Sequence, residues 1–408
     1  QIGTPYGSDG RPYSPDSALL AYASNARDRE VFDVRVRDLR TGDERIVLRG
    51  DDRYLPIAFS PDARLLLVLR LHQNTEQDLF TCDLATGDVR LLTPHDGPAK
   101  HHPVAWLPDS SGVYLCTTGG RDFLGLAALS LDGALTWVDT PEADVEGAAL
   151  SPDGTRLAVV VTLAHDQSQV VVMDRDGGNM RTASPNTQII LSDVAWSADG
   201  RSIAYTMSTR PQAQAVDVFT TDLTTNRVTR LTNTADYGRP GVTLAWSADN
   251  AAVFVSRVAG TTGSGSLEED VSRIDRIAVA DGATTTHAAD LAGPVQAIGA
   301  NGAFALTLRK SGFDGAEVQR RLYREDLVAH TATALTAAAP FHWAELSSTG
   351  SRIVVGENTA AGDVALAHNV TAGRRIRVEH PEYDLLPSEY FRRQIYGCFW
   401  FERDSAGS

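Results

Sequence analysis

Side chains able to bind an anionic or an aromatic group recur in this chain where apolar strand patterns begin. They carry guanidinium, imidazole, phenol or indole groups, and they are Arg53, Tyr54, His101, His102, Tyr237, Arg239, His342 and Trp343. Arg121 belongs to the same set but falls between two strand patterns. Guanidinium groups hold carboxylates through paired hydrogen bonds, and aromatic side chains anchor apolar groups at binding surfaces. These residue types predict binding of a peptide carboxylate or an aromatic side chain.

Other polar combinations favour structural roles over catalysis. His101 and His102 are adjacent in a strand pattern, so they point to opposite faces and cannot easily share one metal ion. The pair at 165 and 166 (His-Asp) has no Ser or Cys nucleophile beside it in a known motif. Arg121 and Asp122 are typical of an ion pair within or between sheets, and the acidic run at 267–270 is typical of a solvated loop. We therefore predict no catalytic residue, no metal and no cofactor.

The elements that carry these residues follow from a turn motif that recurs eight times. Its model copy is Ser151-Pro152-Asp153-Gly154, in which Pro fixes φ, Asp can bond to the local backbone and Gly allows positive φ. The copies, aligned on residues 14, 60, 107, 151, 197, 247, 299 and 347, lie 44 to 52 residues apart. Such a period, built from short strands, predicts an all-β fold: a β-propeller of four-stranded blades.

Eight blades are expected, with seven as the alternative if the first hairpin is only an adjunct. The first repeat lacks an innermost strand, because residues 1–12 are rich in Gly and Pro. Residues 395–401 have strand composition and could close that blade. The predicted domains are a propeller over residues 1–387 and a C-terminal tail over residues 388–408. Helical patterns are expected only at 266–272 and 388–394.

Strand alternation assigns the loops to two faces. The Ser-Pro-Asp-Gly turns share one face with the turns between the third and fourth strands. The blade crossings and the loops between the second and third strands lie on the other face, where we expect binding residues because these loops are longer and more varied. Besides the residues above, this loop face is expected to hold His72, Asp144, Glu146, His165, Asp166 and Arg210.

The composition of the chain disfavours some classes of binding partner. The chain has 408 residues, with 52 acidic against 37 basic residues and a formal net charge of −15. We therefore expect neither nucleic acid nor an anionic membrane as a partner. The three cysteines lack metal-binding spacing and fit a reducing compartment, and no apolar run has the length of a membrane span. A cytoplasmic location is expected, with a cleaved signal peptide as the alternative.

The Ser-Pro-Asp-Gly turn, with the apolar residues around it, resembles the propeller repeats of TolB and of the prolyl oligopeptidase (S9) serine peptidases. The segments 102–106 and 117–126 are similar to the S9 pattern of a strand, an Arg-containing loop and a strand. Leu92-Thr93 and Leu231-Thr232 match the Leu-Thr that ends such blades. The resemblance covers residues 13–380 and implies a propeller that binds or gates peptides.

One departure from the S9 pattern changes the expected function. The chain contains no Gly-x-Ser-x-Gly, and only 28 residues follow the last repeat, so a hydrolase domain is not expected there. We expect a non-catalytic module that binds peptide or protein on its loop face, with a separate α/β-hydrolase among its partners. The alternatives are a TolB-like interaction scaffold and a propeller enzyme with a site at the channel mouth.

The tail has a resemblance of its own. Residues 386–399 look like a segment of the amidohydrolases related to the decarboxylase ACMSD. The His-x-His metal pair of that family is missing, so no activity is expected from this segment.

Overall fold

The computed structural model of the chain describes strands, turns and loops between residues 13 and 386. The described residues are 13–24, 27, 31–73, 75–138, 143–164, 167–185, 194–208, 216–233, 243–262, 269–299, 302–314, 317–336, 338, 341–346, 352–359, 362–369, 375–378 and 385–386. Within them the chain forms eight antiparallel sheets of four strands each. Contacts divide the chain into unit 1 (residues 1–147 and 346–408) and unit 2 (residues 148–345).

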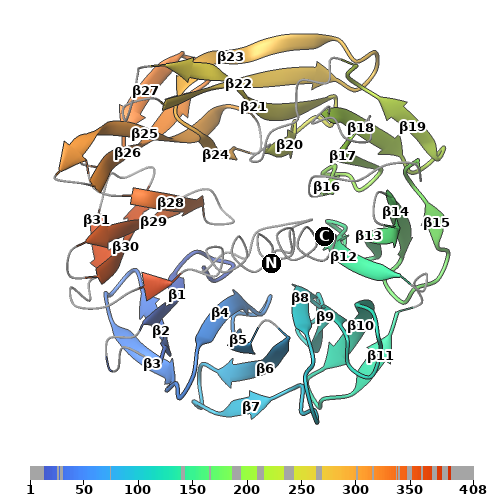
Figure 1. Ribbon diagram of the computed structural model, residues 1–408, viewed down its shortest axis with the longest axis vertical. Coiled ribbons are helices and arrows are strands. Elements are labelled where there is room, and N and C mark those ends of the chain that lie inside the picture. The colour runs from blue at the N-terminus through green and yellow to red at the C-terminus, as the bar shows by residue number, and fades with distance from the viewer. Residues whose placement is uncertain are drawn as a thin grey trace, which may run out of the picture. The chain divides into compact units, whose positions relative to one another are not determined.

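Three sheets lie within unit 1 (Figure 1). The first has the order β3-β2-β1-β32, with β1 (Leu19–Ser24), β2 (Asp33–Asp38), β3 (Glu44–Leu48) and β32 (Leu385–Leu386). The second consists of β4 (Tyr54–Phe59), β5 (Leu65–Gln73), β6 (Glu76–Asp83) and β7 (Val89–Leu91). The third consists of β8 (His101–Trp106), β9 (Gly112–Thr117), β10 (Gly125–Ser130) and β11 (Leu135–Trp137). Within this unit the second sheet lies between the other two.

Three further sheets lie within unit 2. The first consists of β16 (Ala195–Trp196), β17 (Ser202–Ser208), β18 (Val216–Asp222) and β19 (Arg227–Arg230). The second consists of β20 (Leu244–Trp246), β21 (Ala252–Thr262), β22 (Glu269–Ala278) and β23 (Thr284–Ala292). The third consists of β24 (Val295–Ile298), β25 (Phe304–Asp314), β26 (Glu317–Asp326) and β27 (Thr331–Ala334).

The last two sheets contain the residues where the units meet in sequence. One consists of β12 (Asp144–Leu150), β13 (Arg156–Ala164), β14 (Gln167–Asp174) and β15 (Arg181–Thr182). The other consists of β28 (Phe341–Leu346), β29 (Arg352–Thr359), β30 (Gly362–Asn369) and β31 (Arg375–Val378). The predicted all-β fold of four-stranded blades is confirmed, and the eight sheets agree with the larger of the two predicted blade numbers.

The repeated turn is held by its own side chains. In the second sheet, Ser60 Oγ donates to Asp62 Oδ1 at 2.6 Å and accepts the N–H of Leu65 at 2.9 Å. The Ser60 hydroxyl thereby holds the pKa of Asp62 below its usual value. The next residue has positive φ, 59° at Ala63 and 70° at Gly154, which explains why Gly stands there in several copies. The motif therefore encodes a tight strand connection.

Apolar side chains from neighbouring sheets form the cores. In unit 1, Leu55, Leu67, Trp106 and Leu115 belong to one buried cluster shared by the second and third sheets. The indole N–H of Trp106 donates to the carbonyl oxygen of Ala58 at 3.2 Å, which ties these two sheets together. Corresponding bonds hold the other two indoles of the repeat column, from Trp196 to Ala149 and from Trp246 to Ala195. Cys82 and Cys116 are buried in these cores.

The structure differs from the sequence-based expectations around residue 270 and supplies the strand missing from the first sheet. The helix expected at 266–272 is wrong over its second half, because Glu269–Ala278 forms β22, paired with β21. The acidic run at 267–270 is likewise not a loop at its end, since Glu269 and Asp270 lie in this strand. In the first sheet, β32 pairs with β1 through Ala23 and Ser24, where an innermost strand was missing. The run 395–401 and the tail 388–408 lie outside the described residues, so their predicted roles stay predictions.

Candidate functional site

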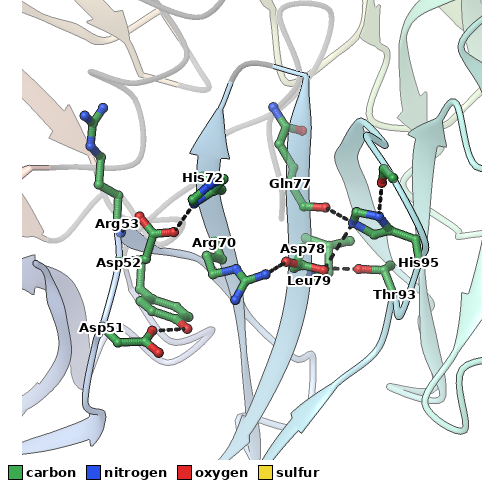
Figure 2. A network of polar contacts seen from close by, with 12 residues as sticks. Asp51, Asp52, Arg53, Arg70, His72, Gln77, Asp78, Leu79, Thr93 and His95 are labelled. Carbon is green, nitrogen blue, oxygen red and sulfur yellow. Dashed lines mark hydrogen bonds and ion pairs between the residues drawn. The ribbon is translucent and has the colours of Figure 1, made fainter.

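Polar side chains gather in unit 1 where β4, β6 and β8 begin and where β5, β7 and β9 end (Figure 2). This is the face on which loop residues were expected to bind. We call it the site face and define it by residues 49–54, 70–78, 93–101 and 117–124. Strand register sets its geometry, because Tyr54 is paired with Arg70 and Arg70 with Asp78 across the second sheet.

The outer edge of the site face carries an exposed cation beside an ordered ion pair. His72 Nδ1 lies 2.8 Å from Asp52 Oδ2, and this bond raises the pKa of His72. Asp52 also accepts the N–H of Arg53 through Oδ1 at 2.8 Å, while the N–H of Leu71 donates to the Arg53 carbonyl oxygen at 2.9 Å. These bonds hold the backbone of Arg53 beside the His72–Asp52 pair. The Arg53 guanidinium points outward and contacts none of the residues drawn in Figure 2.

The tyrosine beside this edge is part of the core. Tyr54 is only 6% exposed, packs edge-to-face on Phe80 with ring centroids 5.6 Å apart, and donates from its hydroxyl to Asp51 Oδ1 at 2.8 Å. Burial, and secondarily the bond to Asp51, raises the pKa of Tyr54 to about 12. Tyr54 is therefore a neutral donor that orders the crossing ahead of Arg53.

Elsewhere on the site face a buried carboxylate contacts a guanidinium and an imidazole. Asp78 pairs with Arg70 Nη2 through Oδ2, and its Oδ1 lies 3.3 Å from His95 Nε2. His95 Nε2 also lies 3.2 Å from the carbonyl oxygen of Gln77, and His95 Nδ1 lies 2.5 Å from the carbonyl oxygen of Gly97. Both ring nitrogens of His95 thus face oxygen acceptors, so both can donate only when the imidazole is doubly protonated. His95 is therefore held in place by contacts at both ring nitrogens.

The site face continues into the third sheet through a second, neutral imidazole. Gln77 Oε1 accepts the N–H of His101 at 3.0 Å, and His101 Nδ1 lies 2.9 Å from Thr117 Oγ1. The rings of His95 and His101 are 5.4 Å apart between centroids. Burial lowers the pKa of His101 to about 3, so this ring is neutral near pH 7. His101 is therefore a structural link between the sheets.

The buried carboxylate–guanidinium pair also occurs in other sheets, which indicates a structural role. Buried carboxylates paired with guanidinium groups also occur in other sheets, at Asp33–Arg27, Asp217–Arg230, Asp275–Arg257, Asp275–Arg273 and Glu325–Arg309. The Arg70–Asp78 pair belongs to this series. The histidines distinguish the site face, because four of the ten in the chain lie between residues 72 and 102.

The residues predicted from sequence have different surroundings. Arg53 is exposed and Arg121 is half-buried, both on the site face. Tyr54, His101 and His102 are buried, so their side chains are not presented to a ligand. His342 and Trp343 lie in β28, where only the backbone is described. Outside the described residues are Tyr237, Arg239, His165, Asp166 and Arg210, whose predicted roles stay predictions.

Several residues of the site face were not predicted from the sequence. Arg70, Gln77, Asp78 and His95 were not among the predicted site residues, although all belong to the network in Figure 2. One signal was present for His95, which follows the Leu92-Thr93 blade end at the start of a crossing. No sequence signal marked Arg70, because its pairing with Asp78 depends on strand register.

Among the described residues no three His, Cys, Asp or Glu side chains gather as a metal site would require. Nor does any helix there have the length and apolar character of a membrane span.

Comparisons with solved structures show the same fold. No protein-family model and no curated protein matches the sequence. The puromycin-hydrolysing peptidase of Mycobacterium tuberculosis is similar over 93% of this chain and 56% of its own, with 12% identity and a TM-score of 0.53. A prolyl endopeptidase structure matches over 87% of this chain and 53% of its own, with 14% identity and a TM-score of 0.52. The Dos1 propeller matches over 84% of this chain and 87% of its own, with 10% identity and a TM-score of 0.57.

These likenesses concern the fold alone. They confirm the predicted β-propeller fold, and the chain spans about half the length of the two peptidases it matches. The resemblance of residues 386–399 to amidohydrolases lies almost entirely outside the described residues and stays a prediction.

Proposed function

We propose that this β-propeller is a non-catalytic module that binds an extended peptide segment on the site face of unit 1. The observation that carries the proposal is the Arg53 guanidinium, which stands beside the ordered His72–Asp52 pair and contacts none of the residues in that network. An exposed guanidinium on a hydrogen-bonded backbone offers several N–H donors to a ligand carbonyl or carboxylate oxygen.

The carboxylates of the site face are mostly engaged by the protein itself. Asp51 accepts the Tyr54 hydroxyl, Asp52 holds His72, and Asp78 lies between Arg70 and His95. Asp52 and Asp78 are therefore paired within the protein and Asp51 is hydrogen-bonded, whereas the Arg53 guanidinium remains available to a ligand. A half-buried acidic group at 76 and an exposed one at 96 also lie on the face. The face thus presents donors and acceptors together, which suits an extended peptide backbone.

The local geometry does not favour catalysis on this face. The hydroxyl–imidazole contact in the cluster joins Thr117 to His101, but these residues are 0% and 5% exposed, so a substrate cannot reach them. The ring nitrogens of His95 already face oxygen acceptors from Asp78, Gln77 and Gly97. A nucleophile and a free general base are thus not brought together here. The peptidase likeness suggests a separate α/β-hydrolase as one partner for the bound peptide.

Peptide binding with matched variants tests the proposal. The probe is a library of fluorescently labelled hexapeptides, read by anisotropy against the full chain. The double variant Arg53→Gln/His72→Gln is expected to bind selected peptides at least tenfold more weakly, since each charge-assisted hydrogen bond contributes about 1.5–3 kcal/mol. Arg64→Gln is the control, because Arg64 lies in the turn at the other end of β5 with a side chain 70% exposed. Failure of every peptide to bind, or equal binding by the double variant, would contradict the proposal.

A further inference from the structure

Arg121 is held between two aromatic rings on the loop that joins β9 to β10. Its guanidinium carbon lies 3.6 Å from the ring centroid of Trp137 and 5.7 Å from that of Phe123. The backbone N–H of Arg121 donates to the carbonyl oxygen of Thr118 at 2.8 Å, which closes the turn that presents the side chain. The guanidinium is therefore fixed in position by stacking.

The neighbouring strand leaves room for this stack. Gly125, the first residue of β10, lies beneath the Trp137 ring. A Cβ atom at this position would meet the Trp137 ring at 2.8 Å and Arg121 Nη1 at 3.1 Å. Trp137 ends β11 and is paired with Ala127, two residues further along β10. Any side chain at position 125 would thus displace the indole or the guanidinium.

The charge of Arg121 has no carboxylate partner among the described ion pairs. The ion pair expected between Arg121 and Asp122 is not found there. By contrast, Arg35, Arg70 and Arg230 each lie within 3 Å of a carboxylate oxygen. Among the described residues near this loop, Asp144 accepts the N–H of Leu124 through Oδ1 at 2.9 Å. Stacking occupies the flat faces of a guanidinium and leaves its N–H edge for other acceptors.

We infer that Arg121, with Trp137 as its platform, is a carboxylate-binding subsite on the site face. A planar guanidinium presented edge-on matches both oxygens of a carboxylate. The carboxylate would come from the C-terminus of a bound peptide or from its Glu or Asp side chains. This inference rests on the proposed peptide binding and names the group that the peptide must carry. It also explains why Arg121 is stacked and not neutralised within the protein.

Three defined peptides test the inference by isothermal titration calorimetry. They are acetyl-alanyl-alanyl-phenylalanine as the free acid, the same peptide as its amide, and acetyl-alanyl-glutamyl-phenylalanine amide. The wild-type chain is expected to bind at least one carboxylate-bearing peptide at least tenfold more tightly than the amide without a carboxylate. Preference for the free acid identifies a C-terminal source, and preference for the glutamyl peptide identifies a side-chain source. Either preference supports the subsite.

Variants at the stack separate binding from structure. Arg121→Gln is expected to abolish the carboxylate preference while leaving the affinity for the plain amide unchanged. Arg121→Lys is expected to restore only part of the preference, because it keeps the charge but loses the planar fork. Arg64→Gln again serves as the control and is expected to keep the full preference. A purely structural stack would instead lower the unfolding midpoint in Arg121→Gln and leave the preference intact, which would overturn the inference.

Different binding results would overturn the Arg121 subsite and the proposed peptide binding. Equal binding of all three peptides to wild type and to Arg121→Gln would overturn the subsite and leave peptide binding in place. Absence of binding by these peptides and by the hexapeptide library would overturn both. A change in tryptophan fluorescence on binding, lost in Trp137→Phe, would locate the carboxylate next to the indole.

Discussion

At the scale of single residues, the histidines in and beside the site face differ in their surroundings. His72 and His95 face carboxylates, whereas His101 and His102 are 5% and 9% exposed. Burial lowers the pKa of His101 to about 3 and that of His102 to about 4. The sequence predicted these side chains as candidates because of their chemistry. Their burial follows from packing between sheets, which a single strand pattern does not show.

The buried histidines predict an acid-sensitive fold. An unfolded histidine titrates near pH 6.5, so between that pH and about 4 the unfolded chain binds protons that native His101 and His102 do not. Their stabilising contribution is complete above pH 6.5 and is lost as the pH falls. We expect a loss of roughly 2 kcal/mol per histidine between pH 7 and pH 5, measured by urea unfolding.

Two variants check the source of this acid sensitivity. His101→Asn, which keeps an acceptor for Thr117, should remove about half of the loss. His330→Asn is the control, because His330 is exposed and its positive φ of 53° also suits Asn. His72 acts in the opposite direction: Asp52 raises its pKa, so its contribution is present at low pH and fades as the pH rises. Equal pH dependence in wild type and His101→Asn would refute this account.

At the scale of elements, the Leu-Thr blade end has a physical explanation. The hydroxyl oxygen accepts a backbone N–H from the residue fourteen positions earlier, on the third strand of the same sheet. The pairs are Thr93 with Leu79, Ser184 with Val170, Thr232 with Val218, and Thr336 with Leu322. The Leu-Thr motif was recognised in the sequence because it resembles the blade ends of TolB and S9 propellers. Its role became clear only from the register of the third and fourth strands.

Removing one of these hydroxyls should destabilise unit 2. Thr232 Oγ1 accepts the N–H of Val218 at 3.0 Å and donates to the buried Asp217 at 2.7 Å. Thr232→Val leaves that N–H unsatisfied and the carboxylate with one donor fewer, so we expect a cost of about 1–3 kcal/mol in thermal or urea unfolding. Thr229→Val, in the same sheet at a half-buried position, should be nearly neutral. Similar stability of both variants would show that the hydroxyl bond contributes little.

At the scale of the whole molecule, the repeats predicted far more of the fold than of the site. Turn chemistry and period are local properties, so the four-stranded sheets and their turns followed from the sequence. The site depends on contacts between strands, such as Asp78 with Arg70 and His95. Those contacts depend on register and on the side chains of neighbouring sheets. The sequence therefore named Arg53 as a candidate, which stays a prediction, and gave no sign of the network beside it.

We propose that a peptide binds at the site face and not at the repeated turns. Hydrogen–deuterium exchange of the full chain, with and without a selected hexapeptide, tests it most directly. We expect slower exchange on peptide binding in residues 49–54, 70–78 and 93–101, and no change in the turns at 60–64 and 107–111. Protection confined to those turns, or to unit 2, would contradict the account.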